Sequence, residues 1–280
     1  MNLGLAGQNA VVIGGTRGIG RAIALGLAEE GVNVGICARG EEALRAAEAE
    51  IGAKRVRAFA GPCDAGEPAA LTGFLDEARE ALGGVDILVH NASALATGPG
   101  LADWEAGLKV DLMGAVHATE HVMPWMEEAG GGSILFVSSI SGLEADPSMG
   151  FGYAAVKAAL IAYAKKLAVM HAPRGIRVNA IAPGFIDTDM TRSLNEDQRE
   201  ALMKDIPLQR LGTPADIAAA PSGQRRGDAS RESGRVLLRA SRWPVERRWR
   251  RGRRWRRRLR RPTPLATGSR RPRRPIRPAC

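Results

Sequence analysis

The sequence has few aromatic side chains, few cysteines and no long hydrophobic run. Aromatic residues make up 4% of the 280 residues, and three cysteines occur. Cys37, Cys63 and Cys280 have neither the even number of a disulfide framework nor a metal-ligand spacing, which favours a reducing compartment. No apolar run reaches the roughly 20 residues of a membrane span, and the N-terminus lacks the pattern of a signal peptide. We therefore expect a cytoplasmic protein with no membrane partner and no metal site.

Lysine is absent from residues 221–280, and the charge of the chain is divided unevenly. This segment contains 22 arginines and 3 acidic residues, a charge of +19, whereas the whole chain carries +10. Residues 1–220 therefore carry −9. We expect two parts: one acidic domain, 1–220, which is long enough to bury a large core, and a basic tail, 221–280.

Within the domain, short apolar runs alternate with longer segments in which apolar residues recur at helical spacing. This alternation predicts a doubly wound α/β fold, a parallel sheet with helices on both faces. The expected strands are Ala10–Ile13, Asn33–Ala38, Val56–Phe59, Asp86–His90, Ser133–Ser138 and Arg177–Ile181. The expected helices are Ile19–Glu30, Glu41–Ile51, Pro68–Leu82, Leu101–Glu128 and Tyr153–Met170. Such sheets bind ligands beyond the carboxyl ends of their strands, so the residues that follow each strand are the functional candidates.

A glycine cluster lies between the first expected strand and the first expected helix. Gly14 allows a tight turn, Gly18 lets the backbone approach a pyrophosphate, and Gly20 lets helix and strand pack closely. Strand, glycine turn and helix together point a helix N-terminus at a phosphate. An ordinary strand-to-helix turn is the alternative interpretation, because glycine motifs alone are weak evidence.

Charged and polar residues after the next strands bear on the choice of cofactor. Arg39 follows the second strand, where an acidic residue would bind the ribose 2′-OH of NAD. An arginine there suits the 2′-phosphate of NADP, and Arg17 in the glycine turn could add a second cation. We therefore expect NADP, with a solvated loop arginine as the alternative. Asp64, after the third strand, could accept from the adenine amino group, and His90–Ser93 would let a cofactor lie against the backbone.

Tyr153 and Lys157 lie four residues apart on an expected helix, so their side chains share one face. A neighbouring ammonium stabilises a phenolate and lowers the pKa of a tyrosine from its usual value of about 10, which suits acid–base catalysis. Ser139, at the end of the fifth strand, could hydrogen-bond a substrate carbonyl. A surface tyrosine packed on a lysine stem is the alternative for this pair in isolation. The position of the pair after the fifth strand, downstream of the glycine turn, favours the catalytic interpretation.

Residues 5–220 resemble the short-chain dehydrogenase/reductase family, and in particular its 3-oxoacyl-acyl-carrier-protein reductase type. The matching motifs occur in the expected order: GGTRGIG (Gly14–Gly20), HNAS (His90–Ser93), the Ser138-Ser139 pair, YAAVK (Tyr153–Lys157) and RVNAIAPGFIDTDM (Arg177–Met190). The resemblance implies a homotetramer in which hydride passes from NADPH to a ketone carbonyl, with 3-oxoacyl thioesters as a candidate substrate.

The resemblance also implies roles for single residues. Tyr153 would donate the proton, Ser139 would orient the carbonyl, and Lys157 would lower the pKa of Tyr153 and bind the nicotinamide ribose. Thr188, with the backbone of Ile186, would hold the carboxamide, and 193–205 would form a mobile helix over the substrate. The implied cofactor-binding residues are Gly14, Thr16, Arg17, Gly18, Ile19, Gly20, Arg39, Asp64, Asn91, Tyr153, Lys157, Pro183, Gly184, Ile186 and Thr188.

Four positions depart from the family pattern. Asp111 stands where the family has an asparagine of the catalytic group, and an ionised carboxylate accepts hydrogen bonds but donates none. The usual NNAG reads HNAS here, so His90 stands in place of an asparagine and Ser93 in place of a glycine. The spacing from Ser139 to Tyr153 is one residue longer than expected, which places a small insertion at 144–149. Carrier-protein reductases present basic residues near the ends of two helices, where this chain has Glu127-Glu128 and Arg174, so only half of that basic patch is present.

The family pattern ends after residue 220, where a further strand at the sheet edge would be expected. Residues 221–280 combine low apolar content with high charge, which predicts disorder. We interpret this tail as the product of a frameshift in a GC-rich gene, a hypothesis that implies reduced activity and a doubtful oligomer. Two alternatives remain: an inactive relic of a reductase, and nucleic-acid binding through arginines interleaved with Trp243, Trp249 and Trp255.

Overall fold

The computed structural model describes residues 4–145, 149–192, 194–206, 208–218 and 236–237. All of them belong to one compact unit, Met1–Arg242. The segment Trp243–Cys280 lies outside the described residues, and so does the rest of the expected tail except for Val236–Leu237. The expected insertion at 144–149 lies partly outside them, because residues 146–148 are not described.

The centre of this unit is a parallel sheet with the strand order β3-β2-β1-β4-β5-β6-β7. The bounds are β1 Asn9–Ile13, β2 Asn33–Ala38, β3 Ala58–Pro62, β4 Ile87–His90, β5 Gly132–Val137, β6 Ile176–Ile181 and β7 Val236–Leu237. The order reverses between β1 and β4, which creates the switch point where such sheets bind ligands. The doubly wound parallel sheet expected from the sequence is confirmed.

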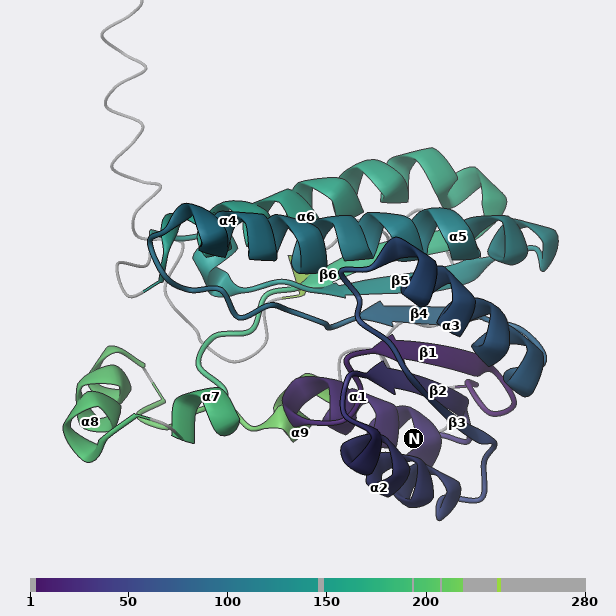
Figure 1. Ribbon diagram of the computed structural model, residues 1–280, viewed down its shortest axis with the longest axis horizontal. Helices are drawn as coiled ribbons and strands as arrows, with labels where there is room; N and C mark the ends of the chain where they lie inside the picture. The colour runs from purple at the N-terminus through teal and green to yellow at the C-terminus, as the bar shows by residue number, and fades with distance from the viewer. Residues whose placement is uncertain (1–3, 146–148, 193, 207, 219–235, 238–280) are drawn as a thin grey trace, which may run out of the picture. The chain divides into compact units, whose positions relative to one another are not determined.

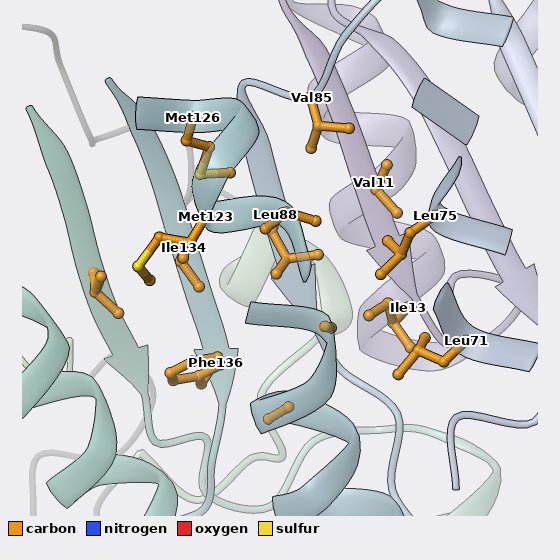
Figure 2. Packing of buried hydrophobic residues seen from close by; sticks show 14 of the residues in the cluster. Val11, Ile13, Leu71, Leu75, Val85, Leu88, Met123, Met126, Ile134 and Phe136 are labelled. Carbon is orange, nitrogen blue, oxygen red and sulfur yellow. The ribbon is translucent and has the colours of Figure 1, made fainter. Parts of the chain in front are cut away.

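Helices cover both faces of the sheet (Figure 1). The helices and helical turns are α1 Gly18–Glu29, α2 Glu41–Gly52, α3 Pro68–Leu82, α4 Leu101–Gly107, η1 Leu108–Met113, α5 Gly114–Glu128, η2 Ile140–Gly142, α6 Phe151–His171, η3 Ala172–Arg174, α7 Asp189–Arg192, α8 Glu196–Asp205 and α9 Pro214–Ala218. On one face, α3, α5 and α6 pack against the strands, and Figure 2 shows Leu71 and Leu75 of α3 beside Val11 and Ile13 of β1. On the other face, α1, α2 and α9 bury a second apolar cluster.

The third strand differs from the sequence expectation of Val56–Phe59. β3 runs from Ala58 to Pro62, and its last two residues, Gly61 and Pro62, pair with Cys37 and Ala38 of β2. Glycine and proline are poor strand formers, so the sequence placed the end of the strand too early. Proline is tolerated here because β3 is an edge strand and needs no ladder hydrogen bond on its outer side.

The expected helix Leu101–Glu128 is divided by a π-helical turn. The turn, η1, spans Leu108–Met113, between α4 and α5. A π-turn holds one residue more than an α-turn and often marks a functional site. The helical spacing of apolar residues is too irregular to show the one additional residue of a π-turn. The sequence therefore did not reveal η1.

A short strand lies beside β6, at the edge where the sequence analysis placed none. Val236 pairs with Ala180 and Leu237 with Ile181, both in parallel. No helix in the part of the chain that the structure describes has the length and apolar character needed to cross a membrane.

Candidate active site at the carboxyl ends of β1, β4 and β5

The three central strands end at one level of the sheet. Ile13 of β1 pairs with His90 of β4, and His90 pairs with Phe136 of β5. The strands are parallel, so the glycine turn after β1, the segment after β4 and the serines after β5 all leave from the same edge. The phosphate-binding and catalytic candidates therefore share one end of the sheet.

The glycine turn is held from two sides. The backbone N–H groups of Gly14 and Gly15 donate to the Cys37 carbonyl at 3.0 and 3.2 Å, and Asn91 Nδ2 donates to the Gly14 carbonyl at 2.8 Å. A Cβ on Gly20 would collide with the Gly14 carbonyl and with Asn91 Nδ2. Gly14 has φ +80°, a conformation that favours glycine. At Gly14 and Gly20, therefore, no side chain larger than hydrogen would fit without strain or collision.

The N-terminus of α1 opens onto this turn. Arg17 is its N-cap residue and makes no side-chain capping hydrogen bond, and the first helical turn contains no acidic residue. Thr16 is half-buried before it, and Ile19 packs against the core in the first turn. Uncapped N–H groups and the positive end of the helix dipole form a site for a phosphate. The residues present therefore fit the pyrophosphate of a dinucleotide.

The charged residues after β2 and β3 differ in their surroundings. Arg39 is exposed, and within the described residues no ion pair involves it. Asp64 accepts a hydrogen bond from the N–H of Gly66 at 2.9 Å, so one of its oxygens is used in a local turn. Within the described part of the chain the second oxygen of Asp64 has no hydrogen-bond donor, so it could accept from an adenine amino group as the sequence analysis expects.

Lys157 is buried among three neighbours. Its side chain is 3% exposed, and Nζ lies 3.1 Å from Asp111 Oδ2. Nζ also donates to the Val137 carbonyl at 3.1 Å and lies 5.6 Å from the ring centre of Tyr153. Tyr153 is half-buried on the same helix, α6. The Tyr-Lys pair of the sequence therefore forms in the structure, with its ammonium group directed toward the end of β5.

Asp111 brings η1 into this site. Its Oδ2 accepts from Ser93 Oγ at 2.6 Å, and its Oδ1 accepts from the Ala94 N–H at 2.7 Å. Asp111 is 1% exposed. Ser93 belongs to the same segment after β4 as Asn91, which clamps the glycine turn. A chain of hydrogen bonds and one ion pair therefore connects the glycine turn segment with Lys157.

His90 lies buried beneath this cluster and is not paired. It is fully buried, and among the described residues neither ring nitrogen has a hydrogen-bond partner. Burial lowers the pKa of His90 to about 4, and the charge of Lys157 adds to the effect. The Asp111 carboxylate and the nearby carbonyls of Asp111 and Val110, which do not reach hydrogen-bond geometry, oppose the shift. His90 is therefore neutral at physiological pH.

The two serines after β5 have different roles. Ser138 Oγ donates to the Lys157 carbonyl at 2.7 Å, which attaches the end of β5 to α6. Ser139 caps η2: its Oγ accepts from the Ser141 N–H at 3.2 Å and lies 3.3 Å from Ser141 Oγ. Ser139 is 9% exposed. It lies two residues beyond Val137, whose carbonyl accepts from Lys157.

The loop after β6 is held by a residue that the sequence analysis did not single out. Thr191 is buried, and its Oγ1 donates to the Ile186 carbonyl at 2.8 Å and accepts from the Thr188 N–H at 3.0 Å. The Pro183 carbonyl accepts from the Ile140 N–H at 3.0 Å, which joins this loop to η2. Gly184 is half-buried within the loop.

The same loop approaches the glycine turn. A Cβ placed on Gly18 would lie 3.4 Å from the Thr188 methyl carbon, so Thr188 lies against the start of α1. Asn195 caps α8, and its side chain accepts from the Gln198 N–H at 2.9 Å. This helix forms most of the segment expected over the substrate, of which residue 193 is not described.

Two contacts in the candidate site escaped the sequence analysis: the ion pair of Asp111 with Lys157 and the hydrogen bond of Ser93 with Asp111. Both join residues that are far apart in the chain. A signal was present, because Asp111 and Ser93 are both departures from the family pattern. Two departures that form one hydrogen bond could have been considered together.

A parallel sheet with a fixed glycine turn at its switch point, and a Tyr-Lys pair beyond a neighbouring strand, define a dinucleotide-binding α/β protein. The family model for short chain dehydrogenases matches residues 8–199. The chain belongs to this family of oxidoreductases, whose members bind NAD or NADP.

Individual relatives agree with this assignment. The 3-oxoacyl-[acyl-carrier-protein] reductase of Staphylococcus epidermidis is 37% identical over 216 residues, which span 75% of this chain and 88% of the relative. A 7α-hydroxysteroid dehydrogenase, solved with NADH and 7-oxo glycochenodeoxycholic acid, is 34% identical with a TM-score of 0.79, covering 85% of this chain and 94% of that one. A short chain dehydrogenase of Burkholderia cenocepacia in complex with NADP is 33% identical, with a TM-score of 0.77 and coverage of 84% and 96%. The resemblance to 3-oxoacyl reductases is confirmed.

Proposed function

We propose that this protein reduces a ketone to a secondary alcohol with NADPH, and that its substrates are 3-oxoacyl thioesters. The observation that carries the proposal is the half-buried Tyr153 phenol beside the buried Lys157 ammonium, at the same sheet edge as the glycine turn. The relatives support the reaction class. A cytoplasmic homotetramer remains a prediction from the family resemblance.

The chain's own residues provide binding and proton transfer. The N–H groups at the start of α1 would hold the pyrophosphate, and Lys157 and Thr188 would hold the nicotinamide riboside. When bound, NADPH supplies the hydride that the carbonyl carbon accepts. Ser139 Oγ would orient the carbonyl oxygen, and the Tyr153 O–H would donate the proton that this oxygen takes up. Burial of Lys157 and Asp111 keeps water from competing for these contacts.

The preference for NADPH is proposed from Arg39 and Arg17. Replacing Arg39 with Asp should lower the ratio of kcat/KM for NADPH to kcat/KM for NADH by about 10²-fold or more. The reason is that a carboxylate would repel the 2′-phosphate that the guanidinium is proposed to bind. Arg45→Asp is the matched control, since Arg45 lies on α2 with its side chain 71% exposed. An unchanged ratio in the Arg39 variant would show that Arg39 is a solvated loop residue.

The thioester is proposed to be carried by a small thiol rather than by an acidic carrier protein. Arg174 Nη1 donates to Glu127 Oε1 at 2.7 Å, and His171 Nδ1 lies 3.3 Å from the same oxygen. The one basic residue left from the expected patch is therefore paired with a carboxylate.

A comparison of thioesters tests this substrate form. We expect kcat/KM for a 3-oxoacyl group on acyl carrier protein to exceed that for the same group on N-acetylcysteamine by less than about threefold, because Arg174, the basic residue that could attract the carrier, is already paired with Glu127. Glu127→Ala should increase the value for the carrier-linked substrate alone. A strong preference of the wild type for the carrier-linked form would contradict this proposal.

A further inference from the structure

The lysine of the proposed catalytic pair already has a partner of opposite charge inside the protein. Lys157 Nζ and Asp111 Oδ2 are 3.1 Å apart, and neither side chain is more than 3% exposed. We propose that Asp111 is a positioning residue that, with Ser93, holds Lys157 in a buried ion pair and so reduces the stabilisation that the ammonium gives to a Tyr153 phenolate. This inference rests on the proposed function, because it concerns the same proton transfer.

Donors surround both carboxyl oxygens of Asp111. Three donors address its two oxygens: Ser93 Oγ at 2.6 Å and Lys157 Nζ at 3.1 Å reach Oδ2, and the Ala94 N–H at 2.7 Å reaches Oδ1. A carboxylate accepts at both oxygens and donates at neither, so this arrangement is satisfied by the charged state. The asparagine of the family pattern would carry no charge here and could not form the ion pair.

The ion pair changes the field that reaches Tyr153. The ammonium lies 5.6 Å from the ring centre of Tyr153 and only 3.1 Å from the Asp111 carboxylate. A lone cation attracts a phenolate strongly in a buried site, whereas a cation with an adjacent anion acts as a dipole, whose effect falls faster with distance. Lys157 also directs a second N–H to the Val137 carbonyl, which turns its donors toward β5.

Among the described residues that surround the pair, no second positive charge compensates for the Lys157 ammonium that Asp111 neutralises. His90, which packs beneath η1 from the end of β4, is neutral at physiological pH. From β5, the neighbours are the Val137 carbonyl and the Ser138 and Ser139 hydroxyls, which are uncharged. Among the ion pairs of the described residues, neither Asp111 nor Lys157 has another partner.

Ser93 and Asp111, which both differ from the family pattern, interact directly with each other. The Ser93 hydroxyl donates to the oxygen that also faces Lys157, and its Oγ accepts from the Leu95 N–H at 3.1 Å. Glycine at position 93 would leave that carboxylate oxygen with one donor fewer. The serine therefore offsets part of the cost of burying the charge that Asp111 introduces.

Tyrosine ionisation can be measured here without enzyme turnover. The chain has two tyrosines, Tyr153 and Tyr163. Burial, with a contribution from Glu120, raises the pKa of Tyr163 to about 12. Comparison with Tyr153→Phe, which removes the other tyrosine, identifies the part of the ultraviolet tyrosinate signal that belongs to Tyr153 in the apoprotein.

The test is the change in this titration when Asp111 is replaced in the full chain. We expect Asp111→Asn to move the midpoint of the Tyr153 signal to lower pH by about one unit, the lower end of the effect of an unscreened neighbouring charge. Asp111→Ser, which also removes the charge, should move it in the same direction and provides a second variant if the first fails to fold. Asp76→Asn on α3 is the matched control, because it removes the same charge at a 61% exposed side chain.

Turnover provides the second readout, with NADPH and a β-ketoester as the probe. The alkaline limb of kcat/KM should move to lower pH in Asp111→Asn together with the absorbance titration. An unmoved titration with kcat/KM lowered equally at every pH would overturn the inference and leave the proposed reductase intact. A shifted titration in a protein without turnover would support the ion pair and refute the proposed function.

Discussion

Replacing Tyr153 with Phe is expected to lower kcat for NADPH-dependent ketone reduction by about 10²–10⁴-fold, because the variant has no O–H to donate to the carbonyl oxygen. Affinity for NADPH should change little, since the glycine turn and the start of α1 are untouched. The measurement is the loss of NADPH absorbance with a β-ketoester, with cofactor affinity determined separately by fluorescence.

Tyr163→Phe is the matched control for this prediction. Tyr163 lies on the same helix, stacks on Phe136 with ring centres 5.7 Å apart, and its hydroxyl has no hydrogen-bond partner among the described residues. Removing that hydroxyl should leave turnover near the wild-type value. If wild type and Tyr153→Phe were equally slow, the chain would be an inactive relic of a reductase, the alternative that the sequence left open.

The stability of the protein is expected to fall by about 3 kcal/mol between pH 7 and pH 4, because His90 is buried in its neutral form. Its pKa is about 4 in the folded protein and 6.5 without burial. Between these values the unfolded chain binds a proton that the folded protein does not, so unfolding is favoured as the pH falls. The contribution is fully present above pH 6.5 and is lost progressively toward pH 4. Each unit of difference is worth about 1.4 kcal/mol.

Urea unfolding of wild type and His90→Asn at several pH values measures this contribution. The asparagine stands at this position in the family pattern, so it should fit the site, and it does not titrate. Between pH 7 and pH 4 the free energy of unfolding of the wild type should fall by about 3 kcal/mol more than that of His90→Asn, as expected from linkage. His121→Asn on α5 is the control for a half-exposed histidine. A pH dependence that His90→Asn leaves unchanged would place the acid sensitivity elsewhere.

The sequence was sufficient to predict those parts of the candidate site that are formed by residues close together in the chain. The glycine turn and the Tyr-Lys pair are local patterns, and a strand or a helix fixes their geometry once it forms. The parallel sheet followed from the alternation of apolar runs, and its strand ends moved by at most a few residues. The error at β3 arose from Gly61 and Pro62, whose extended backbone is imposed by pairing with β2 rather than by their own preference.

The sequence was insufficient where a contact joins distant segments. Asp111 and Lys157 are 46 positions apart, and their ion pair needs the π-turn of η1 to face α6. Asp111 was expected to differ from the family asparagine only in donating no hydrogen bond, because its partner Lys157 was not evident from the sequence. His90 was considered a small polar neighbour of the cofactor, whereas its burial depends on α5 and η1 closing over the end of β4.

The π-turn also determines how the continuous helical segment α4–η1–α5 packs against two other helices. In an α-helix each residue advances the side-chain direction by about 100°, so one additional residue rotates everything that follows by that amount. The part before the turn, α4, packs on α6, and the part after it, α5, packs on α3. In an uninterrupted α-helix of the same sequence, the apolar residues could face either α6 before the turn or α3 after it. The other set of apolar residues would be rotated away from its partner helix. The irregularity that delivers a carboxylate to the buried lysine is thus also what lets the segment contact two different helices, α6 and α3, on the same face of the sheet.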